Sequence, residues 1–261
     1  MSAKLENAPV YYALAQVRFN PVALMPKFAD EIQDRLRKSG FPVFEIVQSH
    51  QIEFGDLTKN PDLKPNVTQT PNWFFTSEDK FNGYVLGTDF FTFQTTNYNT
   101  HEEFFSSFCE GLTLLNEFVG LGAISRIGIR YLDAVVPTEG ESINEYLHQN
   151  ILGVDFGLPW SGGSWESVFK TDEGMLVSKV YKTASATLGF PFDLQPRSVV
   201  MHERFSFSEG KEHAVIDIDH YAEGSFPPDA DTISKLLEKL HASVNKCFNA
   251  IATPLAFERW S

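Results

Sequence analysis

The chain is poor in cysteine and in basic residues, and both shortages narrow what it can be. Cys109 and Cys247 are its only cysteines. Both fall on apolar faces of predicted helices, so buried reduced thiols are expected rather than nucleophiles. Lysine and arginine number 21 against 34 acidic residues, which gives a net charge of −13. A duplex-binding protein usually carries a basic face, so nucleic acid is disfavoured as a partner.

Long apolar runs are also missing. No stretch approaches the length of apolar sequence that a membrane span requires. Residues 1–7 have no apolar signal core. We therefore expect a cytoplasmic protein that does not contact a membrane. The net acidity itself has two interpretations, which are simple solubility and attraction to a basic partner.

Catalytic and cofactor motifs are missing as well. There is no Gly-x-Ser-x-Gly and no Gly-x-Gly-x-x-Gly, and the glycine-rich segment 157–163 lacks the Lys-Ser/Thr pair of a phosphate loop. The seven histidines are scattered, and none has a metal-type spacing to cysteine or to another histidine. We expect no cofactor, no metal and no catalytic residue. Whether the chain is an enzyme stays open at this point, with a non-catalytic role favoured.

Phenylalanine, by contrast, is abundant, with 24 residues. Such aromatic bulk suits a wide sheet packed under helices. One strand-like motif occurs twice, as Gln16-Val17-Arg18-Phe19 and as Gly128-Ile129-Arg130-Tyr131. A second pair of segments, 93–98 and 216–221, leads into a helix-like segment each time. This doubling indicates an internal repeat.

The predicted elements run β-α-β-β-β-β-α in each half of the chain. Strands are expected at residues 9–19, 43–54, 73–76, 84–86 and 90–96, and again at 124–136, 165–170, 175–182, 199–207 and 214–221. A long polar loop is expected at 56–72, and helices at 26–40, 100–120, 142–150 and 229–251. The last helix follows an apolar stripe that is the clearest helical signal in the sequence.

This order predicts an α+β protein with two pseudo-repeated β-α-β4-α halves, residues 1–121 and 122–261. Whether the halves form one continuous domain is left open. The element order resembles that of the TATA-binding-protein-like fold, with antiparallel sheets joined edge to edge and long helices on one face. The likeness is one of architecture, and fold does not imply function.

Strand alternation gathers charged side chains on the sheet face opposite the helices. The candidate ligand-binding residues are Arg18, Arg126, Arg130, His202, Arg204, Asp217 and Asp219. Ordinary cross-strand Arg–Asp pairs, worth roughly 0.2–1 kcal/mol each, explain such a face without a ligand. A concave platform for an anion also explains it, because arginine forks hold carboxylates and phosphates. In a third interpretation, Asp217 and Asp219 hold a hard cation such as Mg²⁺.

Segments along nearly the whole chain are similar to one known family. They are residues 8–10, 15–19, 126–132, 216–219 and 240–248. The sequence there resembles a family of uncharacterised bacterial proteins with a sporadic distribution across species, and the run Arg126-Ile127-Gly128-Ile129-Arg130-Tyr131 is the most specific part. The chain departs from the family pattern at Asn249, where the family tends to have an acidic residue, and at Ala252-Thr253, where it tends to have Ile-Thr.

The family has no established activity, and its distribution suggests accessory or defence-linked bacterial genes. Taken together, these features predict a non-catalytic binding or adaptor protein whose partner is a protein or an anionic small ligand. A homo-oligomer is left open. Two alternatives remain, which are a metal-dependent hydrolase that uses Asp217 and Asp219 and a nucleic-acid-binding module.

Overall fold

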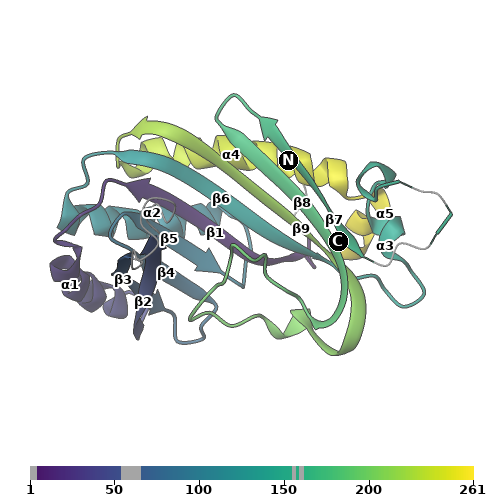
Figure 1. Ribbon diagram of the computed structural model, residues 1–261, viewed down its shortest axis with the longest axis horizontal. Helices are drawn as coiled ribbons and strands as arrows, with labels where there is room; N and C mark the ends of the chain where they lie inside the picture. The colour runs from purple at the N-terminus through teal and green to yellow at the C-terminus, as the bar shows by residue number, and fades with distance from the viewer. Residues whose placement is uncertain (1–4, 54–65, 155–156, 159–161) are drawn as a thin grey trace, which may run out of the picture.

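The computed structural model describes residues 5–53, 66–154, 157–158 and 162–261 (Figure 1). In these residues a single antiparallel sheet contains nine strands, in the order β2-β3-β4-β5-β1-β6-β9-β8-β7. The strands are β1 (Val10–Phe19), β2 (Val43–Glu53), β3 (Asn66–Thr76), β4 (Asn82–Leu86), β5 (Phe90–Thr95), β6 (Ile124–Val135), β7 (Gly163–Lys170), β8 (Met175–Thr187) and β9 (Ser206–Phe226). The helices are α1 (Met25–Lys38), α2 (His101–Val119), α3 (Ile143–Tyr146), α4 (Ala230–Ile251) and α5 (Pro254–Trp260), with the short 3₁₀ helices η1 (Gln149–Ile151) and η2 (Glu203–Phe205).

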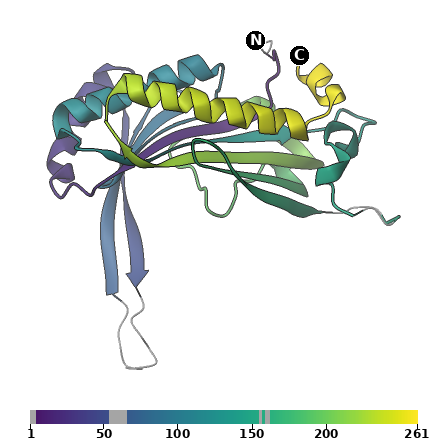
Figure 2. The same ribbon diagram turned by 90° about the horizontal axis from the view of Figure 1, so that it is seen from above.

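The two long helices, α2 and α4, lie side by side along one face of the sheet (Figure 2). Helix α2 begins at Thr100, whose side chain accepts a hydrogen bond from the Glu103 amide. It ends at Gly120, which has a φ of 65°, a left-handed conformation that glycine adopts without strain. Helix α4 begins at Asp229, which caps the Thr232 amide in the same way. No helix in the described residues is both long and apolar enough to cross a bilayer.

The main hydrophobic core lies between these helices and the sheet. On β6, Ile127, Ile129 and Tyr131 are buried in this core, as strand alternation predicts. A second, smaller apolar cluster lies on the opposite face, where it includes Tyr11 and Tyr12. Polar residues of that face therefore sit beside apolar ones and not on an open polar surface.

The prediction of two β-α-β4-α halves with two joined sheets is wrong. Strands β1 and β6 pair along the middle of the sheet, with Arg18 opposite Arg126, so hydrogen bonds join both parts of the chain into one sheet. The strand predicted at 199–207 does not form, because residues 199–205 lie in a loop and in η2, and β9 runs unbroken from Ser206 to Phe226. Residues 208–211, between the two predicted strands, are part of β9 and form no turn, because the long β8 pairs with β9 on both sides of them.

The segment between β8 and β9, residues 188–205, folds back across the sheet face opposite α2 and α4 (Figure 2), and we call it the strap. Gly189 accepts a hydrogen bond of 2.7 Å from the Tyr11 hydroxyl. Further along, the carbonyls of Arg197 and Val200 accept bonds of 3.0 and 2.6 Å from Gln94 and Thr96. The strap therefore spans the sheet from β8 to the neighbourhood of β5.

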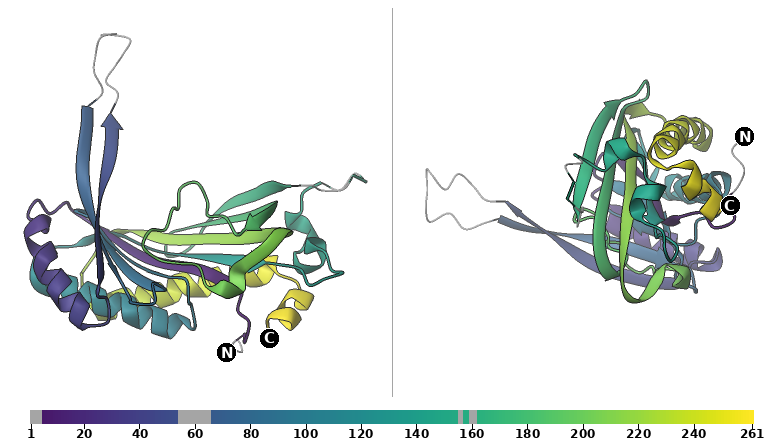
Figure 3. Two further views of the ribbon diagram at one scale, coloured as in Figure 1. Left: turned by 90° about the horizontal axis from the view of Figure 1, so that it is seen from below. Right: turned by 90° about the vertical axis from the view of Figure 1, so that its right-hand side faces the viewer.

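The hairpin of β2 and β3 leaves the sheet and projects on the side opposite the long helices (Figures 2 and 3). Only residues 73–76 of β3 pair with β4, so residues 47–53 and 66–72 form a two-stranded ribbon, which we call the arm. The predicted loop at 56–72 is therefore wrong from Asn66 onward, and its part at 56–65 lies outside the described residues. Pro71 fits in the arm because only one side of β3 is hydrogen-bonded there.

Candidate functional site

The strongest polar contact of the strap-covered face joins β6, β9 and the strap. Arg130 donates from Nε and Nη2 to the two carboxylate oxygens of Asp217, at 2.7 and 2.8 Å. Its Nη1 and Nη2 also donate to Asp193 of the strap, at 2.7 and 3.2 Å. The Tyr181 hydroxyl lies 3.4 Å from Asp217. One guanidinium thus holds two carboxylates with two forks.

This network is buried at one end and open at the other. Arg130 is 7% exposed and Asp217 is 2% exposed, whereas the Asp193 side chain is 60% exposed. Burial opposes the charge of Arg130, but the hydrogen bonds to Asp217 and Asp193 outweigh it and raise the arginine pKa. The hydrogen bond from Arg130 lowers the pKa of Asp193. Both of the donor forks of Arg130 are occupied while the strap is in place.

A second pair lies further along the same face. Arg126 places its guanidinium carbon 4.0 Å from the centre of the Tyr221 ring and its Nη2 3.8 Å from Asp219. Burial raises the pKa of Asp219, and the Arg126 charge opposes that rise. Gly128 lies between the two arginines, and a Cβ there would meet Tyr221 Cβ at 3.0 Å and Arg126 Nη1 at 3.7 Å. The glycine of the Arg-Ile-Gly-Ile-Arg run therefore leaves the space in which Arg126 stacks on Tyr221.

The other predicted site residues are more scattered. Arg18 is exposed on β1, opposite Arg126 in the register, so it belongs to the same face. His202 and Arg204 were predicted to lie on a strand, and that prediction is wrong. They lie at η2, where the strap ends. His202 stacks on Phe81 at 5.4 Å. Both line a separate cavity of about 770 Å³ near the start of α2. The structure thus brings Arg18, Arg126, Arg130, Asp217 and Asp219 to one face and places His202 and Arg204 apart.

The pair Asp217 and Asp219 is poorly arranged for a metal ion. Arg130 occupies both carboxylate oxygens of Asp217. The part of the chain that the structure describes holds no cluster of three or more His, Cys, Asp or Glu suited to a metal. A divalent cation bound at Asp217 would therefore have to displace the Arg130 guanidinium.

A different polar group lies on the helix-covered face, in what we call the helix-face cavity, of about 540 Å³. Its lining comes from the N-terminal segment, the start of α2, β6 and α4. The lining residues that carry its chemistry are Tyr98, His101, Glu102, Tyr131, Asp133, Glu238 and His241. Tyr131 and Asp133 are each 4% exposed. Burial, with a smaller contribution from Asp217, raises the pKa of Asp133 to about 8.

Two histidines stack at the wall of this cavity. The rings of His101 and His241 lie 4.2 Å apart with an interplanar angle of 16°. Burial and the neighbouring His101 lower the pKa of His241 to about 4, so His241 is neutral at physiological pH. The two nitrogens of His101 lie 3.3 Å from Glu102 and from Glu238. The imidazole stack therefore joins α2 to α4 at the edge of the cavity.

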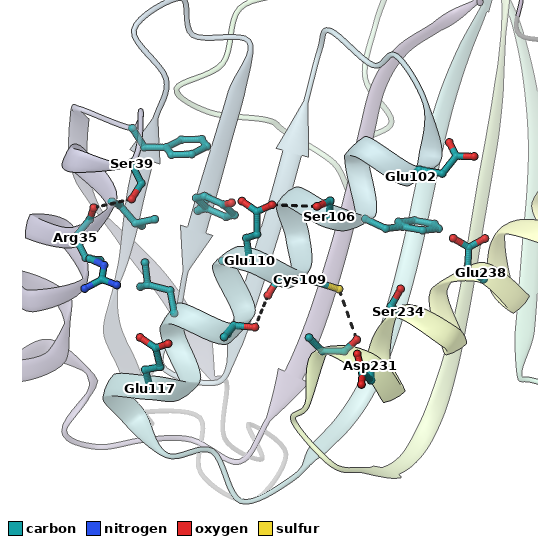
Figure 4. A pocket seen from close by; sticks show the side chains of 18 residues that line it. Arg35, Ser39, Glu102, Ser106, Cys109, Glu110, Glu117, Asp231, Ser234 and Glu238 are labelled. Carbon is teal, nitrogen blue, oxygen red and sulfur yellow. Dashed lines mark hydrogen bonds between the residues drawn. The ribbon is translucent and has the colours of Figure 1, made fainter.

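An acidic groove of about 660 Å³ runs along the outer side of α2 (Figure 4). Its charged lining residues are Arg35, Glu102, Glu110, Glu117, Asp231 and Glu238. Cys109 lies in it, with its sulfur 3.9 Å from the Ala230 carbonyl oxygen. Burial, and then Glu110, raises the pKa of the Cys109 thiol to about 11. The thiol is thus neutral at pH 7, in keeping with the prediction that Cys109 is not a nucleophile.

Sequence reasoning missed Asp193 and Asp133. Asp133 had a usable signal, since it continues the inward series of Ile127, Ile129 and Tyr131 and is the acidic member of that series. Asp193 had no such signal, because a loop residue reaches Arg130 only through the course of the strap.

In comparisons with known proteins, no family model, curated protein or solved structure matches the chain. The resemblance to the sporadically distributed bacterial family stays a prediction.

Proposed function

We propose that the protein is a non-catalytic binding or adaptor protein that docks onto a protein partner through its arm. The observation that carries the proposal is the projection of the arm from the body (Figure 3). A two-stranded ribbon is only marginally stable by itself in water, and its open edges offer unpaired backbone groups. The described side chains of this ribbon are exposed or half-buried, so it is well placed to pair with, or pack on, another chain.

The charge of the arm favours a protein partner over nucleic acid. Residues 47–53 and 66–72 contain one acidic residue, Glu53, and no lysine or arginine. A ribbon that enters a DNA groove needs cations for the phosphates. Among the side chains described on the arm, Gln48, Ser49 and Thr68 are exposed and polar. Together with the net charge of −13, this composition suits a partner with a basic surface.

The other functions receive less support from the described geometry. An anionic ligand at Arg130 would compete with Asp193 and Asp217, which leaves Arg18 and Arg126 as the accessible arginines among the predicted site residues of that face. The hydrolase alternative requires a metal at Asp217, where Arg130 already binds both oxygens. The bacterial accessory or defence setting rests on the family resemblance and is part of this proposal.

Removing the arm tests the proposal. Ile46 and Trp73 face each other in the register, so replacing residues 47–72 with Asn-Gly closes the hairpin with a tight turn. A partner is first isolated on the full-length protein from cells that encode it, then purified and titrated by calorimetry. We expect the arm-less variant to lose at least about a hundredfold in affinity, or ~2.7 kcal/mol, with little change in melting temperature.

A matched pair of point variants tests the arm without deleting any residues. Gln48→Lys and Gln48→Glu change one exposed arm residue to opposite charges. For a basic partner, Gln48→Lys weakens binding and Gln48→Glu leaves it equal or tighter, and both differences shrink in high salt. A partner that binds the arm-less variant as tightly as the intact protein would show that docking occurs elsewhere.

A further inference from the structure

The helix-face cavity has an unbalanced set of charges. Three carboxyl groups line it, those of Glu102, Asp133 and Glu238, and the described lining contains no lysine or arginine. His241 is half-buried and neutral at physiological pH, because burial and the neighbouring His101 lower its pKa, so it supplies no fixed positive charge. His101 contacts Glu102 and Glu238, but no basic side chain of the lining pairs with Asp133 in the way that Arg130 pairs with Asp217 on the other face.

Two of the polar groups in the cavity lack hydrogen-bond partners among the described residues. The Tyr131 hydroxyl is buried and makes no hydrogen bond of normal length and angle, although it interacts with Tyr98, whose ring centre lies 5.4 Å from its own. The Asp133 carboxyl receives no side-chain or amide donor, and only its backbone pairs, with Val10 and Ile216. Both side chains are 4% exposed and both line the cavity. Buried polar groups are normally satisfied, so these two indicate a missing donor.

We propose that the helix-face cavity binds a small organic cation, a primary amine with a short aliphatic stem, whose ammonium group donates hydrogen bonds to Asp133 and Tyr131. An ammonium supplies three donors and one positive charge. It satisfies both orphan groups at once and offsets the cost of an ionised carboxylate in a dry site.

The walls of the cavity fit the rest of such a ligand. Tyr98, Tyr131 and Phe248 present aromatic surfaces, which attract cations. Val10, Ala242 and Val244 supply aliphatic surface for a methylene stem. The volume of about 540 Å³ lies within the range of small-molecule sites, roughly 300–1,000 Å³.

The position of the other two carboxylates favours a diamine over a monoamine. Glu102 and Glu238 are 68% and 48% exposed, so they lie at the open side of the cavity while Asp133 lies inside. A second ammonium at the far end of the stem would meet these outer carboxylates. The ligand class is therefore a short diamine or polyamine, and the inference stands independently of the proposed docking by the arm.

Binding of an ammonium to Asp133 carries a proton signature. The Asp133 pKa is raised to about 8, so its carboxyl is protonated in the free protein at pH 6.5 and releases about one proton when a cation binds. The other titratable groups that face the cavity are Tyr98, His101, Glu102, Tyr131, Glu238 and His241. Of these, His241 is already neutral, and the two tyrosines have pKa values far above this range.

The test is calorimetric titration of the whole protein with 1,4-diaminobutane, 1-aminobutane and 1,4-butanediol. Each is measured at pH 6.5 in two buffers of different ionisation enthalpy. We expect the diamine to bind, the monoamine to bind more weakly and the uncharged diol not to bind. The variants Asp133→Asn and Tyr131→Phe should weaken the diamine by at least about tenfold and about threefold, and Asp133→Asn should abolish the proton release. Glu117→Gln, an exposed acid of α2 outside the cavity, should change neither.

Melting temperatures of the variants separate loss of the site from loss of the fold. Tyr131→Phe removes a buried hydroxyl, and Asp133→Asn replaces a buried carboxyl that is partly ionised at pH 8 by a neutral amide, so both variants should fold at least as stably as the parent at pH 8. The proposal is wrong if the parent protein does not bind the diamine at about 10 mM, the weakest affinity of interest. It is also wrong if Asp133→Asn binds the diamine as tightly as the parent does, or if the parent binds the diol as tightly as the diamine.

Discussion

Arg130 and Asp193 are 63 positions apart in the sequence, yet Nη1 of the arginine lies 2.7 Å from Oδ2 of the aspartate. The contact fastens the strap to the centre of the sheet. Phe190 contributes to the same attachment, with its ring centre 5.6 Å from Tyr11 and 5.5 Å from Tyr12. The strap is thus held by one ion pair, by aromatic packing and by the backbone acceptors described above.

The two carboxylates that bind Arg130 should contribute unequally to stability. Asp217→Asn leaves a buried arginine without its charged strand partner, which should cost about 3–5 kcal/mol. Asp193 is largely exposed, so Asp193→Asn should cost only about 0.5–1.5 kcal/mol. Urea unfolding of both variants measures the difference. Equal losses would mean that the exposed strap carboxylate stabilises Arg130 as much as the buried strand carboxylate does.

Gly128 should not tolerate even a methyl group. A Cβ at this position would lie 3.0 Å from Tyr221 Cβ, on the strand that pairs with β6. Gly128→Ala should therefore lower the free energy of unfolding by about 1–2 kcal/mol and disturb the stacking of Arg126 on Tyr221. Gly122 is the matched control, since a Cβ there meets nothing within 4 Å. If Gly122→Ala proves as costly as Gly128→Ala, the crowding at Tyr221 is not the cause.

Asp133 should make the protein less stable as the pH rises. Burial raises its folded-state pKa to about 8, above the ordinary value of 3.8, so folding favours the protonated form. The stability from this group is fully present below pH 3.8 and is lost as the pH rises to 8. The loss is at most about 1.4 kcal/mol per pH unit. Relative to Asp133→Asn, the parent should lose melting temperature between pH 5 and pH 8, and parallel curves would contradict the assignment.

The thiol of Cys109 should react slowly with alkylating reagents. Burial raises its pKa to about 11, so at pH 8 its thiolate fraction is roughly a hundredfold below that of an ordinary cysteine. The pKa of Cys247 is also raised by burial. Iodoacetamide labelling of the single variants Cys109→Ser and Cys247→Ser, followed by mass spectrometry from pH 7 to 10, measures each thiol separately. Rapid labelling of Cys109 at pH 7 would show that the thiol is more accessible than its packing implies.

The sequence alone was sufficient to predict the helices and strands whose patterns depend on residues close together in the chain. The helices predicted at 100–120 and 229–251 correspond to α2 and α4. Alternation on β6 placed Ile127, Ile129 and Tyr131 in the core, and therefore Arg126 and Arg130 on the opposite face. These inferences hold because capping, helical periodicity and strand alternation depend on residues only a few positions apart.

Only the tertiary structure decided which strands join and what covers the far face. Pairing of β1 with β6 makes one sheet, and the long pairing of β8 with β9 removes the hairpin expected near residue 210. The strap then carries Asp193 onto Arg130 and takes His202 and Arg204 away from the strands. Such pairings depend on the packing of segments far apart in the chain, which local patterns do not encode. For the same reason, alternation could point Asp133 inward, but only the packing of α2 and α4 over β6 leaves its carboxyl in a cavity without a partner.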